Sequence, residues 1–247
     1  MPLTKSVGNM YPWVTHMISH LRGECPHRCL YCYVKSTTAG RMGLYDGPLS
    51  LSENALKANH MTPSVMREAK EKGLDFPVIF IDHMNDLWAK PVPRDWIERV
   101  LFHCGLYSEC TYVFQTKNPE RYNEFLPLLP PNRILGCTIE TDDLALSGRV
   151  SKAPPPEDRM RSMAGLHRMG ERTFVTIEPI LKCYPYKLAM MMHVCEPDFV
   201  NIGADSKGTG LDEPSGADVI ELIAELNRLG IEIRAKHNLD RLMQKGK

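Results

Sequence analysis

Three cysteines near the start of the chain have the type and spacing to hold a metal. Cys25, Cys29 and Cys32 lie within eight residues, in the pattern Cys-x3-Cys-x2-Cys. Thiolates at this spacing can face one point from one short loop. They make an incomplete shell for tetrahedral zinc, and they leave one iron of a 4Fe-4S cluster open to a small molecule. A zinc site completed by His27 or by a distant residue is the alternative.

Composition bounds the class of protein. The chain has 247 residues, 43% of them apolar, and 30 basic residues balance 30 acidic ones. Zero net charge produces no general attraction to nucleic acids or anionic membranes. The N-terminus has no apolar signal segment, and no apolar run is long enough to span a bilayer. We therefore expect a cytoplasmic protein with no membrane contact, forming one domain over 1–247 with an N-terminal arm over about 1–12.

The remaining cysteines show no second ligand pattern. They are scattered along the chain, which suits a reducing compartment. Cys137 is expected in the core. The five positions are Cys104, Cys110, Cys137, Cys183 and Cys195.

Short apolar runs rich in β-branched residues alternate with helical patterns from residue 76 to the end, which favours a parallel sheet. Repetition through six or more units predicts a curved sheet or partial barrel. The segment 40–47 is expected to be a loop and 142–156 to be irregular, with the three prolines at 154–156 outside any helix. The predicted strands cover 13–21, 76–83, 110–116, 133–140, 172–178, 198–203 and 231–236. The predicted helices cover 54–59, 64–72, 94–104, a segment starting at Asn118-Pro119, 157–169, 187–194 and 215–229.

Polar residues follow several predicted strands at their carboxyl ends, where barrels of this kind place their chemistry. The tripeptide Thr-Ile-Glu occurs twice, and strand alternation puts Thr138 and Glu140 on one face, as it does Thr176 and Glu178. Buried carboxylates need partners. These side chains are therefore expected to line a polar cavity; the alternative is that they cap the next helix or face solvent.

The cysteine loop, with Tyr31 just before its third cysteine, resembles that of the radical S-adenosylmethionine (SAM) superfamily. Further motifs follow one another in an order that resembles the phage Gp37/Gp68-like subgroup, related to the spore photoproduct lyase-like enzymes. The resemblance runs from about residue 13 to the end. Its motifs are Asn85-Asp86-Leu87, Thr116-Lys117-x-Pro-Glu-Arg121, Thr138-Ile139-Glu140, Arg149 and Ile177-Glu178-Pro179.

This resemblance implies an α/β fold, a partial (β/α)6 TIM-like barrel of parallel strands with outer helices. It also implies that Cys25, Cys29 and Cys32 hold a 4Fe-4S cluster whose fourth iron binds SAM. Reductive cleavage of SAM would yield a 5'-deoxyadenosyl radical that abstracts hydrogen from a substrate. The implied partners are an electron donor such as flavodoxin or ferredoxin and a nucleotide or nucleic-acid substrate.

The resemblance also suggests cofactor-binding residues. Where the superfamily often has a Gly-Gly-Glu segment for the SAM amino group, this chain has Met84-Asn85-Asp86, so Asn85 or Asp86 is the candidate acceptor. The other candidates for SAM or its loop are Tyr31, Thr116, Lys117, Thr138, Glu140, Arg149 and Glu178, with Lys117 or Arg149 for the carboxylate and Glu178 for SAM or substrate. By position alone, Cys183 is a candidate to return a hydrogen atom.

A second function from another class is a metal-stabilised module that recognises nucleic acid through a zinc or iron–sulfur loop, without SAM chemistry. Basic residues near the C-terminus could contact phosphate. SAM cleavage discriminates the two functions. The basic residues are Arg234, Lys236, His237, Arg241, Lys245 and Lys247.

Overall fold

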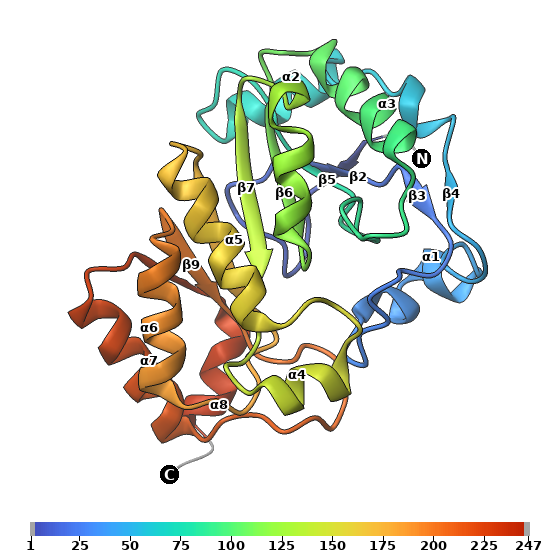
Figure 1. Cartoon of the computed structure of the whole chain (residues 1–247). Coiled ribbons are helices and arrows are strands. Elements are labelled where there is room, and N and C mark those ends of the chain that lie inside the picture. Colours follow the sequence, from blue (N-terminus) through green and yellow to red (C-terminus); the bar gives the residue numbers. More distant parts are fainter. Residues whose placement is uncertain (1–2, 245–247) are drawn as a thin grey trace. The chain divides into compact units, whose positions relative to one another are not determined.

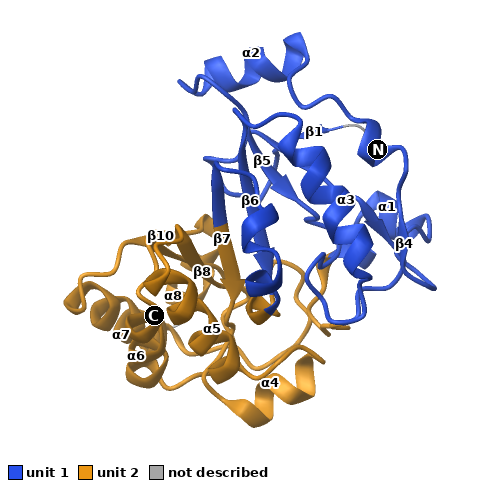
Figure 2. Ribbon diagram, turned by 45° about the horizontal axis from the view of Figure 1, so that its top comes forward, with its two compact units in different colours: residues 1–26, 34–116, 121–134 blue, residues 27–33, 117–120, 135–247 orange. Residues whose placement is uncertain are grey.

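The computed structural model describes residues 3–244 (Figure 1). The chain forms two compact units, shown in different colours in Figure 2. Unit 1 consists of Met1–Pro26, Val34–Thr116 and Arg121–Ile134, and unit 2 consists of His27–Tyr33, Lys117–Glu120 and Leu135–Lys247.

Unit 1 contains a sheet in the order β1-β2-β5-β6. The short strand β1 (Thr4–Lys5) runs antiparallel to β2 (His16–Ile18), so the predicted N-terminal arm carries a strand. Strands β5 (Val78–Ile81) and β6 (Thr111–Thr116) continue the sheet in parallel. A separate antiparallel pair joins β3 (Leu21–Arg22) to β4 (Ser50–Leu51).

The helices of unit 1 follow local sequence signals. Helix α2 (Pro63–Glu71) overlaps the predicted 64–72, with the Thr62 hydroxyl accepting from Val65 N and proline at the first position. Trp88 packs edge-on against Phe114, Tyr122 and Phe125 in the core. Further helical segments are η1 (Tyr33–Ser36, of which 34–36 belong to unit 1), α1 (Thr38–Arg41), η2 (Ala55–Lys57), α3 (Arg94–Gly105) and η4 (Leu126–Leu128).

Unit 2 contains four parallel strands in sequence order. The register pairs Thr138 with Thr176 and Thr176 with Asn201. One face of these strands is apolar and includes Cys137, which is fully buried as expected. The strands are β7 (Arg133–Thr138, of which 135–138 belong to unit 2), β8 (Thr173–Ile177), β9 (Phe199–Ile202) and β10 (Ile233–Ala235).

Helices cover the apolar face of the unit 2 strands. In Figure 1, α5, α6 and α7 lie side by side, consistent with the packing of α6 against both neighbours. Helix α7 begins with a reciprocal capping box between Ser215 and Asp218. The helices are α4 (Leu144–Val150), α5 (Pro156–Arg168), α6 (Pro185–Cys195), α7 (Gly216–Arg228), η5 (His237–Leu239) and α8 (Asp240–Gln244).

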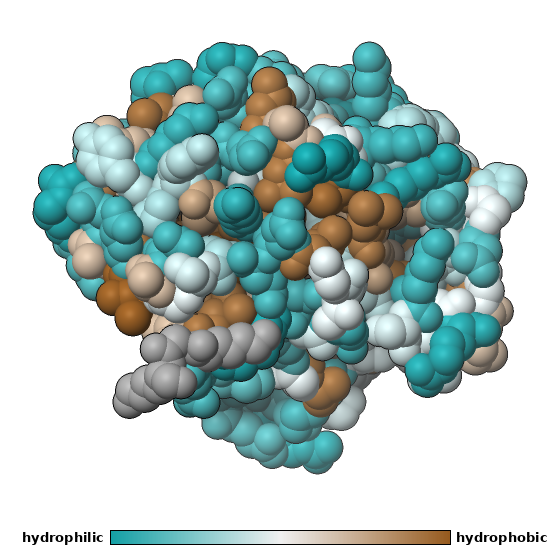
Figure 3. Space-filling model, turned by 90° about the horizontal axis from the view of Figure 1, so that it is seen from below, coloured by the Kyte–Doolittle hydropathy of each residue, from teal (hydrophilic) through white to brown (hydrophobic). Residues whose placement is uncertain are grey.

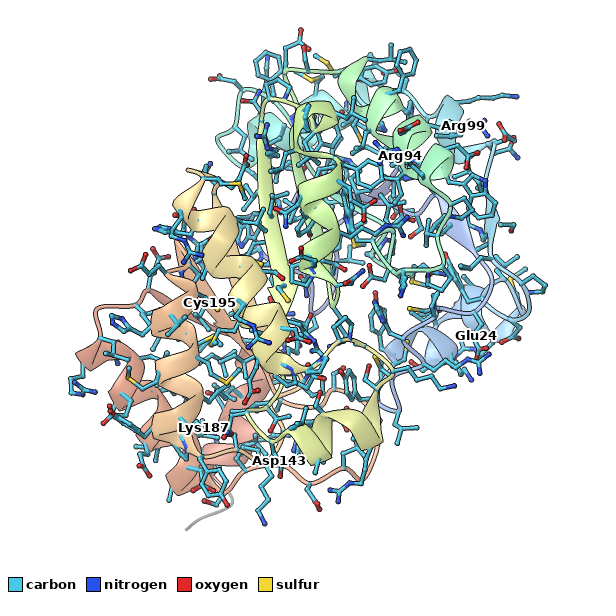
Figure 4. The ribbon with its side chains drawn as sticks, viewed as in Figure 1. Glu24, Arg94, Arg99, Asp143, Lys187 and Cys195 are labelled. Carbon is cyan, nitrogen blue, oxygen red and sulfur yellow. The ribbon has the colours of Figure 1, made fainter. Side chains whose placement is uncertain are left out.

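The expectation that 142–156 is irregular is wrong. Helix α4 occupies Leu144–Val150 because the Asp143 carboxylate, labelled in Figure 4, accepts from Leu146 N and caps it. Pro156 is the first residue of α5, where its missing N–H costs nothing. The first residues of the expected loop at 40–47 belong to α1. The segment after Asn118 is the 3-10 helix η3 (Pro119–Glu124).

No helix in the range 3–244 is both long and apolar enough to cross a membrane. On the face drawn in Figure 3, hydrophilic side chains predominate and hydrophobic ones form separate patches.

Candidate functional site

The cysteine loop is held in place by backbone hydrogen bonds within unit 2. Leu30 N donates to Val150 O at 2.9 Å, and Lys152 N donates to His27 O at 2.7 Å. The loop turns through Arg28, which has a left-handed φ of 46°. Residues 27–30 are therefore fixed against the segment that follows α4.

Cys29 has a polar contact inside this loop. Its Sγ lies 3.2 Å from Ser151 Oγ, and Ser151 is buried. The same hydroxyl lies 3.3 Å from His27 O and accepts from Ala153 N at 3.1 Å. Apolar side chains close the other side, because Cys29 packs against a cluster that includes Tyr31 and Leu181.

The donor set of the loop suits an iron–sulfur cluster. Cys25 belongs to unit 1, whereas Cys29 and Cys32 belong to unit 2. All three are half-buried cysteines, and their soft sulfur atoms are the ligands that such clusters require. Within the part of the chain that the structure describes, no three Cys, His, Asp or Glu side chains are drawn together as metal ligands. The chemistry of the loop thus fits the cofactor.

Glu140 is the centre of a buried network in unit 2. Tyr31 Oη donates to Glu140 Oε1 at 2.9 Å. Lys117 Nζ lies 3.1 Å from Glu140 Oε2 and 5.0 Å from the centre of the Tyr31 ring. Three of the predicted site residues, from distant parts of the sequence, therefore meet after β7.

Arg159 on α5 completes this network. Its Nη1 lies 2.7 Å from Glu140 Oε2 and 3.0 Å from Thr138 O. Its Nε donates to Pro154 O at 2.6 Å, and the side chain is fully buried. Arg159 thus joins α5 to the end of β7 by charge-assisted bonds.

The charges in the network decide the ionisation of its members. Burial alone would raise the pKa of Glu140, but the positive charges of Lys117 and Arg159 outweigh it and lower the pKa to about 2. Burial and the nearby Glu140 carboxylate raise the pKa of Tyr31 well above its usual value. At neutral pH the network holds an ionised carboxylate and a neutral phenol.

Unit 1 gathers a second group of predicted residues. Thr116 Oγ1 donates to the Asp86 carboxylate at 2.8 Å, and Trp88 N donates to the same group at 2.9 Å. Asn85 Nδ2 donates to Gly23 O at 3.0 Å, two residues before Cys25. The loop after β5 is therefore tied to the chain that leads into the cysteines.

The second Thr-Ile-Glu segment forms a polar row on unit 2. Asn201 Nδ2 donates to Thr176 Oγ1 at 3.4 Å. Beyond them, Glu178 Oε2 lies 2.6 Å from Lys236 Nζ. The polar face predicted by alternation is therefore present, and Glu178 is ion-paired.

Cys183 is half-buried, and burial followed by the Asp142 and Asp218 carboxylates raises its pKa to about 12. It is a thiol at neutral pH. Asp142 is buried, with Lys187 Nζ 3.5 Å from its Oδ2; Lys187 is labelled in Figure 4.

Other predicted residues stand apart from these contacts. Arg149 is exposed on the last turn of α4. In the basic tail, Arg234 pairs with Glu232, and Arg241 pairs with Glu213. Lys245 and Lys247 lie outside the described residues.

Sequence reasoning missed Arg159 and Ser151. Arg159 sits among the charged residues Glu157, Asp158 and Arg161, a pattern typical of a solvated helix face. Only its burial against β7 distinguishes it. Ser151 carries no motif, and its role follows from the loop that packs on it.

Comparison with solved structures identifies the fold. Streptococcus suis SuiB bound to S-adenosylmethionine matches with a TM-score of 0.59 and 13% identity, over 89% of this chain and 50% of SuiB. A spore photoproduct lyase mutant matches with a TM-score of 0.66 and 10% identity, over 94% of this chain and 80% of the lyase. A radical SAM methyltransferase from Sphaerobacter thermophilus matches with a TM-score of 0.60 and 16% identity, over 94% of this chain and 69% of the methyltransferase.

These likenesses confirm the predicted α/β fold, the partial barrel of parallel strands with outer helices. The chain spans about half the length of SuiB. No curated protein matches the sequence significantly. A family described as a protein of unknown function, DUF5131, matches residues 13–210. Since that match extends over most of the sequence, the chain belongs to the DUF5131 family.

Proposed function

We propose that this protein is a radical SAM enzyme. The observation that carries the proposal is the Cys-x3-Cys-x2-Cys spacing of Cys25, Cys29 and Cys32, on a loop of a fold shared with a SAM-bound protein and a radical SAM methyltransferase. When bound, the cluster would supply an electron that cleaves SAM, giving a 5'-deoxyadenosyl radical for hydrogen abstraction. The three thiolates would be its protein ligands.

The chain's own residues would hold SAM and its loop. We assign to Glu140 the task of fixing Tyr31, and through it the cysteine loop, because the carboxylate accepts a hydrogen bond from the Tyr31 hydroxyl. Lys117, with its Nζ at the same carboxylate, is the candidate for the SAM carboxylate. Asn85 and Asp86 are candidates for the amino group, since an ammonium needs oxygen acceptors. The remaining SAM candidates are Thr116, Thr138, Arg149 and Glu178.

Cys183 is assigned the return of a hydrogen atom to the substrate radical. The raised pKa, about 12, keeps its S–H bond intact at neutral pH, which such a transfer requires. In a Cys183→Ala variant the products should shift; unchanged products would remove this role.

The substrate class proposed is a nucleotide or nucleic acid, from the phage Gp37/Gp68-like resemblance. The spore photoproduct lyase neighbours include a complex with a dinucleoside spore photoproduct. SuiB, in contrast, is seen with a precursor peptide. We further propose a cytoplasmic location and a flavodoxin or ferredoxin as electron donor.

Anaerobic reconstitution with iron and sulfide tests the proposal. We expect an electron paramagnetic resonance signal in the reduced protein that changes on adding SAM, together with formation of 5'-deoxyadenosine. Both should be lost in Cys29→Ala and kept in Cys195→Ala, whose thiol is buried on α6 (Figure 4). Zinc in place of iron, or a cluster indifferent to SAM, would overturn the proposal and favour a metal-stabilised nucleic-acid-binding module.

A further inference from the structure

A basic surface covers the outside of the cysteine loop in unit 2. It consists of Arg28, Leu30, Arg149 and Lys152, and we call it the basic loop face. All four side chains are exposed, and Leu30 retains 63% of its accessible area. An exposed leucine with cations around it has the composition of a small docking site, with an apolar centre and a polar rim.

Backbone contacts hold the members of this face together. The bond from Leu30 N to Val150 O places Leu30 beside the last turn of α4, which carries Arg149. The bond from Lys152 N to His27 O places Lys152 beside Arg28. Two segments that are far apart in sequence are therefore fixed into one surface, and no large movement is needed to form it.

The local charge is unusual for this chain. Residues 27–33 and 144–156 contain three basic side chains and no Asp or Glu, although acidic and basic residues balance over the whole sequence. Two carboxylates border the second segment: Asp143 caps the opposite end of α4, and Glu157 lies in the first turn of α5. Among the ion pairs of residues 3–244, none involves Arg149 or Lys152. Their charges are thus available to an acidic partner.

We propose that the basic loop face docks the electron donor, a small acidic flavin or iron–sulfur protein with carboxylates around its redox centre. This inference rests on the proposed function, in which each SAM cleavage consumes one electron that the donor loses. Cys29 follows Arg28 and precedes Leu30 in the chain, and its side chain packs inward while Leu30 remains exposed. A donor seated on Leu30 would therefore lie one residue from a cluster ligand. Charge complementarity would also speed and orient the encounter.

Calorimetric titration of a flavodoxin with net negative charge into the purified protein tests the surface directly. We expect binding that weakens as salt increases. The Arg149→Gln/Lys152→Gln variant should bind about tenfold more weakly, in line with losing two rim charges. The control variant Arg168→Gln/Arg172→Gln removes two exposed charges, one at the C-terminal end of α5 and one just before β8, and should bind as the parent does.

Reduction measurements separate this inference from the proposed function. With dithionite as reductant, 5'-deoxyadenosine formation should be unchanged in Lys152→Gln, which lies outside the proposed SAM site, whereas with flavodoxin it should fall severalfold. Leu30→Ser should also weaken flavodoxin binding. If no cluster assembles, binding to the cluster-free protein still reports on the surface. Equal flavodoxin affinity in both double variants, or a single-stranded DNA that binds the face while flavodoxin does not, would overturn the docking proposal.

Discussion

Lys236 and Glu178 form an ion pair across the strand that separates them, with Nζ 2.6 Å from Oε2. The register aligns both residues with Gly203, which follows β9. A Cβ at Gly203 would lie 2.8 Å from Glu178 Oε1. The missing side chain therefore leaves the room that the pair occupies.

Replacing Gly203 by alanine should break this arrangement. The added methyl group must displace the Glu178 carboxylate, and overpacking of this kind costs about 1–3 kcal/mol. Denaturant unfolding of the purified variant measures the loss. Gly165→Ala is the matched control, since a Cβ there meets only the tip of Arg168 at 4.0 Å and alanine favours the α5 helix. Equal stability of the two variants would contradict the crowding argument.

The Glu140 network predicts strong coupling between Glu140 and Arg159. Glu140→Leu leaves a fully buried guanidinium without its carboxylate, and Arg159→Met removes the other partner, so each single change should cost about 3–5 kcal/mol. The double variant should lose less than the sum, because neither charge remains unpaired. Arg228→Met, which breaks an exposed pair with Glu225, should have little effect. Additive losses in urea unfolding would show that the pair is not coupled.

The Ser151 hydroxyl should raise the reduction potential of the proposed cluster. Once Cys29 is an iron-bound thiolate it can only accept hydrogen bonds, and the Ser151 hydroxyl 3.2 Å away can donate one. Hydrogen bonds to cluster sulfurs help to set the reduction potential. Ser151→Ala should shift the midpoint potential to a lower value in a redox titration. Ser151→Thr keeps the hydroxyl and should stay near the parent value; a matching shift in both variants would mean that packing, not the hydrogen bond, is responsible.

A group of buried histidines in unit 1 predicts acid sensitivity. His60 lies beside His103, with ring centres 4.5 Å apart, and its Nδ1 contacts Tyr112 Oη at 2.8 Å. Burial, followed by the charges of His103 and His20, lowers the pKa of His60 from 6.5 to about 3. Between these values the unfolded chain binds the proton and the folded chain does not, so stability falls as pH drops.

A His60→Phe variant removes this titration while keeping an aromatic ring. From pH about 7.5 to about 5, the parent should lose roughly 2 kcal/mol more unfolding free energy than the variant. Urea unfolding at the two pH values measures the difference. His193→Gln, at an exposed position on α6, should follow the parent. Parallel pH profiles of parent and His60→Phe would refute the assignment.

The strands were the most predictable part of the fold. Apolar, β-branched runs predicted 133–140 and 198–203, close to Arg133–Thr138 and Phe199–Ile202. Helix α4 was missed because it is short and stands between a polar turn and three prolines, so its periodicity is weak. A side-chain cap from Asp143 stabilises it, and such a bond is not visible in hydrophobic spacing.

The sequence predicted only those parts of the candidate site that depend on a local pattern. Strand alternation placed Thr176 and Glu178 on a polar face, which the contacts to Asn201 and Lys236 bear out. The partners of Glu140 depend on tertiary packing. Lys117 precedes it by 23 positions and Arg159 follows it by 19, and no local pattern joins them.

The two hydrogen bonds that fix residues 27–30 also have a thermodynamic consequence. Ordering the backbone of one residue costs about 1–2 kcal/mol of conformational entropy. The backbone bonds to Val150 and Lys152 already order His27, Cys29 and their neighbours when unit 2 folds. A ligand captured by this segment would not have to order it, so its affinity would reflect the bonds formed rather than a coupled disorder-to-order transition.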